Sequence, residues 1–274
     1  MRSPAIEAAF RAACLAELDA LKAGNVHRYS EGHGMSVAHF QMAAEAAAPE
    51  IARTGAPVGA RIEAAVRASF AATRLNTNLG IVLLCAPLAA AADGGGELRT
   101  ALGKVLDGLD VGDARAAYRA IALANPGGLG RAEEHDVHEE PGIGLREAMA
   151  HAAARDRIAR QYASGYADVW GIGLARLAAL GAAEPEAQVE AVHLAFMSAF
   201  LDSHVVRKFG EEIAEAVRTE AEMVERTVRW SAPAELRHPP LAAFDASLKA
   251  RGLNPGTSAD LTVATLFAAQ LGRR

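Results

Sequence analysis

Asn76-Thr77-Asn78-Leu79-Gly80-Ile81-Val82-Leu83-Leu84-Cys85-Ala86 joins a polar tripeptide to the most apolar run in the chain. A helix that begins there is apolar on every side, so we expect it to be a core helix. Its first backbone N–H groups lack partners within the helix, and with the helix dipole they favour a phosphate group at the helix entrance. Asparagine is also a common N-cap residue, so Asn76 or Asn78 could simply cap this helix. Both interpretations stay open.

Helical periodicity continues along the rest of the chain. Ile6, Phe10, Cys14 and Leu18 recur at four-residue steps, which is typical of an amphipathic helix. No alternating run rich in Val, Ile or Thr indicates a strand. We therefore predict an all-α fold, a single compact multi-helix domain of about ten helices over residues 1–274. After the first helix, the predicted helices span residues 36–48, 58–75, 78–92, 97–109, 113–124, 145–180, 186–208, 209–229, 233–251 and 258–272.

Composition narrows the class of protein. With 274 residues, of which 51% are hydrophobic, the chain can bury a large core as one domain or as two closely joined helical lobes. The net charge is −5 and no long Lys/Arg block occurs, so nucleic acid is not an expected partner. Basic residues occur in ones and twos, as at Arg207-Lys208, a pattern that fits a phosphate-rich small molecule.

The cysteines and the apolar segments indicate the compartment. Cys14 and Cys85 lie in apolar helical segments, which is typical of buried thiols under reducing conditions. The first residues reach acidic side chains before any signal-peptide core forms. The apolar stretch 79–92 contains Pro87 and is too short to span a bilayer, which needs about 20 residues. We expect a cytoplasmic protein without a membrane partner, and the alanine-rich helices would allow a homodimer.

A glycine-rich segment separates two halves of the helical pattern. Residues 125–144 carry no helical periodicity, and a stretch of this length in a compact domain is usually a functional loop or is disordered. It contains His135-Asp136-Val137-His138, which is a weak metal-site pattern because no further ligand pair accompanies it.

Asp202 is the most unusual single residue. It follows a long apolar segment, and on a helical projection it shares a side with Leu194, Ser198 and Val205. A carboxylate among apolar neighbours must be paired, protonated or bound to a cation. An ion pair with an arginine such as Arg207 and a cation or substrate site are both compatible with the sequence. His193 and His204 lie on the adjacent face, where packing is the commoner role, and they are left out of the predicted site.

Two further polar stretches interrupt the helices. In Asn254-Pro255-Gly256-Thr257-Ser258-Ala259-Asp260 a tight turn precedes a helix, and Thr257 with Asp260 has capping-box spacing. The same helix start could bind phosphate or a metal bridged to one. In Lys22-Ala23-Gly24-Asn25-Val26, Gly24 could end the first helix and Lys22 could complement its dipole, whereas Asn25 has no evident structural role.

Taken in order, these stretches resemble the triphosphoribosyl-dephospho-CoA synthase family over nearly the whole chain. Lys22–Val26 is similar to the family's Lys-Pro-Gly-Asn/Leu-Val segment, and Asn76–Gly80 to Asn-Thr-x-x-Gly. Phe200–Gly210 is similar to the Asp-Thr…Arg-x-Gly segment, and Asn254–Leu261 to the closing Ser/Asn-Pro-Gly-x-x-Ala-Asp-Leu. Four such segments in this sequence order are fairly specific.

The resemblance implies an all-α enzyme that uses ATP as a glycosyl donor. The 2′-hydroxyl of dephospho-CoA attacks C1′ of the ATP ribose, and adenine leaves. Mg²⁺ is the implied cofactor, with Asp202 and Asp260 as its ligands or as carboxylates that stabilise charge at C1′. The implied catalytic residues are Asp202, Asn76 and Asn78. The implied ATP-binding residues are Lys22, Asn25, Thr77, Thr257 and Ser258.

This chain departs from the family pattern in two places. Well-described members have His-Lys where this chain has Asn78 and Leu79, and no Arg-Gly-Glu segment is evident. The departures resemble a divergent branch associated with one-carbon cofactor metabolism. Two alternatives therefore accompany the transferase prediction: the same ribosyl transfer to another cofactor precursor, and a helical nucleotide-binding protein without activity.

Overall fold

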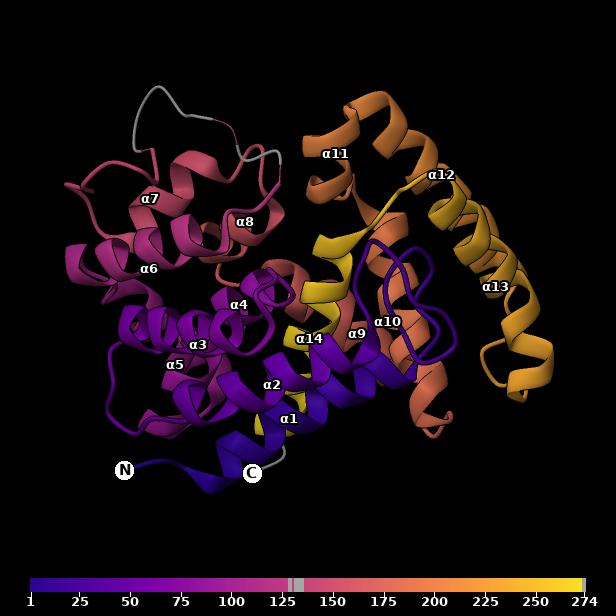
Figure 1. The fold of residues 1–274 in the computed structure, drawn as a ribbon. Coiled ribbons are helices and arrows are strands. Elements are labelled where there is room, and N and C mark those ends of the chain that lie inside the picture. Colours follow the sequence, from indigo (N-terminus) through magenta and orange to yellow (C-terminus); the bar gives the residue numbers. More distant parts are fainter. Residues whose placement is uncertain (128–129, 131–135, 273–274) are drawn as a thin grey trace. The chain divides into compact units, whose positions relative to one another are not determined.

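The computed structural model describes residues 1–127, 130 and 136–272, and within them every regular element is helical (Figure 1). Isolated bridges such as Arg2 with Arg53 occur, but no β-strand forms in these residues. The predicted all-α class is confirmed. The predicted number of helices is too low, since the described residues form fourteen α-helices and one π-helical segment.

The helices follow one another as α1 (Pro4–Asp19), α2 (Val37–Ile51), α3 (Val58–Thr73), α4 (Leu79–Gly94), α5 (Leu98–Asp107), α6 (Val111–Ala124), α7 (Leu145–Ala152), α8 (Arg157–Ser164), η1 (Val169–Leu174), α9 (Ala175–Leu180), α10 (Pro185–Ala199), α11 (Ser203–Phe209), α12 (Glu211–Thr227), α13 (Ala234–Ala250) and α14 (Gly256–Leu271).

Two helices predicted as continuous are divided by polar caps. The predicted helix 145–180 ends first at Ala152, and Asp156 then caps α8 by accepting a hydrogen bond from the Ala159 N–H at 3.0 Å. Gly165 (φ 65°) ends α8 in the left-handed region. The predicted helix 186–208 breaks at Phe200, whose backbone is extended. In both cases a local cap ends a helix that apolar periodicity alone would continue.

Contacts between Cα atoms divide the chain into two compact units. The first unit comprises Met1–Ala13, His39–Tyr166 and Phe267–Arg274, and the second comprises Cys14–Ala38 and Ala167–Leu266. The single domain over residues 1–274 stays a prediction, because it concerns how these units combine.

The first unit is built around α4. As predicted, this helix is buried on all sides, with Ile81–Ala89 in the core. Pro87 lies inside the helix and has no N–H to donate to the Leu83 carbonyl four residues earlier. The buried Tyr162 hydroxyl donates to that carbonyl at 2.6 Å, and Tyr166 donates to Leu84 O at 2.8 Å. Tyr162 thus satisfies the carbonyl that the proline leaves without a helical donor, and Tyr166 adds a hydrogen bond to the next carbonyl.

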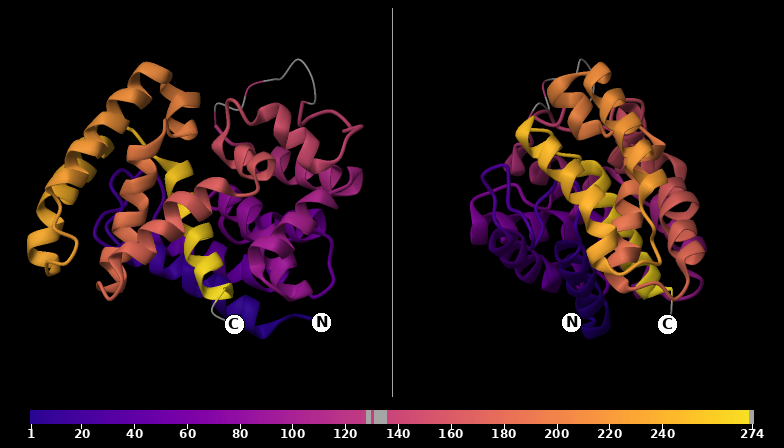
Figure 2. Two further views of the ribbon diagram at one scale, coloured as in Figure 1. Left: turned by 180° about the vertical axis from the view of Figure 1, so that it is seen from behind. Right: turned by 90° about the vertical axis from the view of Figure 1, so that its right-hand side faces the viewer.

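The second unit is a helical layer in which α10 packs against α12, and α12 against α11 and α13 (Figures 1 and 2). Its core includes Leu194, Val217 and Phe244, together with Leu21 from the segment after α1. The segment 20–36 that follows α1 contains no helix and carries the first of the motif stretches.

No single helix in the described residues is long and apolar enough to cross a membrane. The helix pairs α4–α5 and α10–α11 reach the required length only together, and they are bent by 112° and 52°.

Candidate functional site

The start of α4 in the first unit keeps an unpaired hydroxyl. Asn78 occupies the N-cap position, but its side-chain amide donates to Ser69 Oγ at 3.0 Å and not back to the helix. Asn76 Oδ1 accepts from the Leu79 N–H at 3.4 Å, which is a long hydrogen bond. Thr77 Oγ1 is buried and has no hydrogen-bond partner. Capping by asparagine therefore explains Asn76 in part, and it leaves the Thr77 hydroxyl unexplained.

The backbone at this helix start is also open. In the part of the chain that the structure describes, the N–H groups of Gly80 and Ile81 have no acceptor. Buried donors are almost always paired, so a helix entrance with two N–H groups beside an orphaned hydroxyl can receive an anion. Leu79, where the family has a basic residue, adds no charge and is itself buried.

In the second unit, the turn Lys22–Val26 is held together by polar contacts. Lys22 is fully buried, and its ammonium group pairs with Glu17 and donates to Val26 O at 2.9 Å and Asn25 Oδ1 at 3.3 Å. Burial lowers the pKa of Lys22 and raises the pKa of Glu17, and the attraction between the two groups opposes both changes. The Lys22 ammonium thus pairs with groups inside the protein, and its hydrogen bond to Asn25 Oδ1 helps to hold that side chain in place.

Asn25 joins this turn to the one before α14. Its side-chain Nδ2 donates to Asn254 Oδ1 at 2.9 Å, so two stretches 229 residues apart meet in the second unit. Gly24 (φ 79°) makes the approach possible, because a Cβ there would lie 2.7 Å from Pro255 Cδ and 3.1 Å from Leu253 O. No structural role for Asn25 was evident from the sequence, and this tertiary contact supplies one.

Asp202 is not on a helix face, as the helical projection placed it. It is the N-cap of α11, where Oδ1 accepts from the His204 N–H at 2.9 Å and the Val205 N–H at 3.3 Å. Oδ2 accepts from Ser258 N and Ser258 Oγ, both at 2.8 Å. Burial raises the pKa of Asp202, and the four donated hydrogen bonds act in the opposite direction. The carboxylate therefore ties the start of α11 to the start of α14.

The last helix, α14, begins two residues earlier than predicted, at Gly256. Thr257 and Asp260 lie inside the first turn of α14 rather than at a capping box. The Thr257 hydroxyl contacts Ser203 Oγ at 3.0 Å and accepts from the His204 N–H at 3.2 Å. Asp260 is partly exposed, and its charge raises the pKa of Lys22. Lys22, Asn25, Asp202, Thr257, Ser258 and Asp260 are thus brought together in the second unit, whereas Asn76–Asn78 belong to the first.

Sequence reasoning left out two histidines that lie against these motifs. His193 is buried, contacts Ala23 O at 3.3 Å, and has its pKa lowered to about 3, chiefly by burial. His204 lies so close to Gly256 that a Cβ there would be 2.4 Å from its Nδ1. Burial, with help from Lys208, Arg207 and His33, lowers the pKa of His204 to about 3. Gly256, after Pro255, was a sequence signal that another group approaches the backbone closely. The sequence did not indicate that this group is His204.

Two parts of the chain carry side chains of the kinds that bind metal ions. Glu186, Glu190 and His238 offer three atoms within 4.8 Å of one another in the second unit. However, Glu190 already accepts from Arg237 and from His238, and Arg28 lies 3.4 Å from Glu186. The carboxylates of this group are therefore already paired with side chains of the protein. For the pattern 135–138, His135 lies outside the described residues, and His138 pairs with Asp136 at 2.7 Å.

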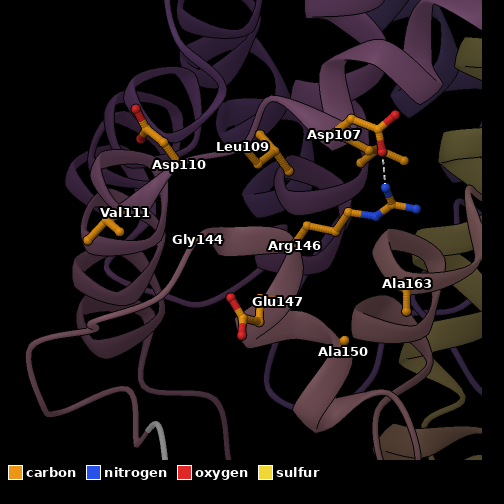
Figure 3. Close-up of a pocket in the computed structure, with 10 residues that line it drawn as sticks. Asp107, Leu109, Asp110, Val111, Gly144, Arg146, Glu147, Ala150 and Ala163 are labelled. Atoms are coloured by element: carbon orange, nitrogen blue, oxygen red, sulfur yellow. Dashed lines mark hydrogen bonds and ion pairs between the residues drawn. The ribbon is translucent and has the colours of Figure 1, made fainter.

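A pocket of about 590 Å³ opens in the first unit between the α5–α6 turn, α7 and α8 (Figure 3). Its charged lining residues are Asp107, Asp110, Glu147 and Arg146, and Arg146 is paired with Asp107. Three carboxylates against one paired cation would repel a triphosphate. None of the predicted site residues lines this pocket.

Comparisons with known proteins agree with the motifs. The family model CitG, described as ATP:dephospho-CoA triphosphoribosyl transferase, matches residues 3–274. A crystal structure named as a triphosphoribosyl-dephospho-CoA synthase from Archaeoglobus fulgidus is 26% identical and covers 84% of this chain and 97% of its own, with a TM-score of 0.67. None of the curated proteins matches. The chain therefore belongs to the CitG family and is an ATP-dependent transferase that moves a triphosphoribosyl group to dephospho-CoA.

Proposed function

We propose that the two motif regions serve this transfer as phosphate-binding helix starts, each within its own unit. At the start of α4, Asn76, Thr77 and Asn78 bind a phosphate group of a nucleotide substrate. In the second unit, Asn25, Thr257 and Ser258 surround the substrate's phosphates, and Lys22 fixes Asn25 in place. The observation that carries the proposal is the buried Thr77 hydroxyl without a partner beside two open backbone N–H groups.

The reaction needs little covalent chemistry from the protein. The 2′-oxygen of dephospho-CoA forms a bond to C1′ of the ATP ribose while the bond from C1′ to adenine breaks and its electrons go to adenine. The hydroxyl proton passes to a carboxylate, and adenine takes up a proton as it leaves.

Mg²⁺ is the proposed cofactor, held by carboxylates together with the substrate's phosphates. Asp260 fits this role, since Mg²⁺ in nucleotide enzymes usually takes one or two carboxylates and completes its shell with phosphate and water. Asp202 is the second proposed ligand and fits less well, because all four lone-pair positions of its carboxylate accept hydrogen bonds. Bound Mg²⁺ would neutralise phosphate charge.

A cytoplasmic location and a homodimer belong to this proposal as predictions. Asn78 and Leu79 replace the His-Lys of well-described members, so the experiment compares acceptors directly.

The deciding experiment measures free adenine. Purified protein is incubated with ATP and Mg²⁺, with and without dephospho-CoA, and adenine is quantified by chromatography. Adenine release that requires dephospho-CoA is expected. Release with a different cofactor precursor instead would identify another acceptor. Tight ATP binding by calorimetry without adenine release for any acceptor would show a nucleotide-binding protein that has lost activity.

Thr77→Val provides the matched test of the site, because it keeps shape and removes only the hydroxyl. We expect the affinity for one nucleotide substrate to fall about tenfold, as for loss of one hydrogen bond to a charged group. Thr73→Val is the control. Thr73 is also a buried threonine, but the partners of its hydroxyl are the backbone groups Ser69 O, Leu75 O and Leu75 N–H. Equal effects of the two variants would contradict the assignment.

A further inference from the structure

The turn Lys22–Val26 owes its shape to one carboxylate that lies outside every motif. Asp245, on α13, is buried, and its Oδ1 accepts a hydrogen bond from the Gly24 N–H at 2.8 Å. The same oxygen lies 3.4 Å from His27 Nε2. One side chain from a distant helix therefore contacts the turn on both sides of Asn25.

Lys249 completes this attachment one helical turn later on α13. Its ammonium group lies 3.0 Å from Asp245 Oδ1, donates to Ser30 O at 3.0 Å, and lies 3.3 Å from His27 Nε2. Its aliphatic stem passes close to Gly32, where a Cβ would lie 3.3 Å from Lys249 Cε. The pair Asp245–Lys249 thus holds both the motif turn and the segment that follows it.

The turn has little freedom once these contacts form. Gly24 O is in contact with His33 Nε2 at 2.8 Å, so both backbone polar groups of Gly24 are engaged. Asn25 Oδ1 accepts from the Val26 N–H at 2.8 Å, and Asn25 Nδ2 donates to Asn254 Oδ1. A shift of Gly24 would move Asn25 directly, because the two residues are adjacent.

We propose that Asp245 is a positioning residue for ATP binding, which holds Asn25 in its binding geometry through the Gly24 N–H and His27. The inference rests on the proposed role of Asn25 toward the phosphates of ATP. Asp245 touches no substrate in this arrangement, and it acts through the turn.

Asp245→Asn is the test variant, because it keeps the size of the side chain and removes its charge. We expect KM for ATP to rise about tenfold and kcat to change less than about threefold, since binding lost equally in ground and transition states appears in KM. Asp113→Asn is the matched control in the first unit. Asp113 is a buried aspartate that accepts from a glycine N–H, that of Gly59, at 2.6 Å, and it lies outside the motif set. Its variant should lose stability and keep both constants.

A double-mutant cycle separates positioning from a general effect on the fold. If Asp245 acts through Asn25, then Asp245→Asn in an Asn25→Ala background should raise KM for ATP by less than about twofold. A full tenfold rise in that background, or no rise in the single variant, overturns the inference. If Asn25→Ala by itself leaves KM for ATP unchanged, the proposed role of Asn25 is wrong, and the inference that depends on it is wrong as well. If only Asn25→Ala raises KM, the inference alone fails.

Lys249→Gln keeps the inference testable should Asp245→Asn not fold. It removes the ammonium group that contacts both oxygens of Asp245 and so holds this carboxylate beside the Gly24 N–H. A rise of KM for ATP in the same direction is expected, and an unchanged KM overturns the inference.

Discussion

At the residue scale, the buried polar side chains of the motifs in the second unit stabilise the turns and helix starts that carry them. Asp202 was predicted from its apolar surroundings to need a partner, and that physical argument is right, because four donors meet its carboxylate. The partners are backbone N–H groups and a serine hydroxyl at two helix starts, and not the guanidinium group of Arg207.

The first residue-scale prediction concerns Asp202. Asp202→Ala should lower the free energy of unfolding by about 3 kcal/mol, because it removes a helix cap and leaves the buried Ser258 N–H without an acceptor. Urea denaturation measures this loss. Asp202→Asn should cost less, since asparagine also caps helices. If Asp202→Asn is nearly as stable as the parent and keeps Mg²⁺-dependent turnover, Asp202 is not a metal ligand or a catalytic group.

The second concerns the pH dependence set by His193. Its folded pKa is about 3, below the ordinary value near 6.5, so the unfolded chain takes up a proton first as the pH falls. Stability from this group is complete above about pH 6.5 and is lost toward pH 3, with a slope of about 1.4 kcal/mol per pH unit. The free energy of unfolding, taken from denaturation curves at pH 7.0, 6.0 and 5.0, should therefore depend less on pH in His193→Gln than in the parent. The exposed His151 provides the control, and an equal loss of pH dependence in His151→Gln would contradict this account.

At the scale of elements, α4 shows how a helix with a proline in its interior is kept in a core. The Tyr162 hydroxyl replaces the N–H donor that the helix lacks at Pro87, and the Tyr166 hydroxyl donates to the neighbouring Leu84 carbonyl. Sequence periodicity predicted the burial of α4 correctly but could not show that α8 supplies Tyr162, because Tyr162 follows Leu83 by 79 positions in the chain.

Tyr162→Phe should lower the free energy of unfolding by about 2 kcal/mol, because it leaves the buried Leu83 carbonyl unsatisfied. In a Pro87→Ala background the new N–H can pair with that carbonyl, so the same change should cost about 1 kcal/mol less. The two losses are compared by urea denaturation. Identical costs in both backgrounds would show that the tyrosine does not replace the missing helix bond.

At the scale of the whole molecule, a chain of net charge −5 must bind a triphosphate against its own average field. Binding of the polyanion therefore depends on local donors and on a counter-ion, and not on overall charge. This reasoning agrees with the absence of long basic blocks in the sequence.

We expect ATP with Mg²⁺ at about 100 times its Kd to stabilise the protein by about 2.7 kcal/mol, which corresponds to a rise in Tm of roughly 5–10 °C for a chain of this size. Adding EDTA should remove most of this rise, and Asp260→Asn should do so without EDTA. Thermal unfolding followed by circular dichroism gives the answer. A full shift with ATP in EDTA would show that binding does not require the metal.

The sequence by itself determined the helical class, the burial of α4 and the positions of most helix ends, because these depend on local periodicity and on glycine, proline and cap residues. It also determined the family, since four short motifs in order need no knowledge of their contacts. Only the tertiary structure decided that Asn25 meets Asn254, that Asp202 joins two helix starts, and that Asp245 holds the first turn. Such pairings join residues far apart in the chain, and no local pattern encodes which distant partner will satisfy a buried polar group.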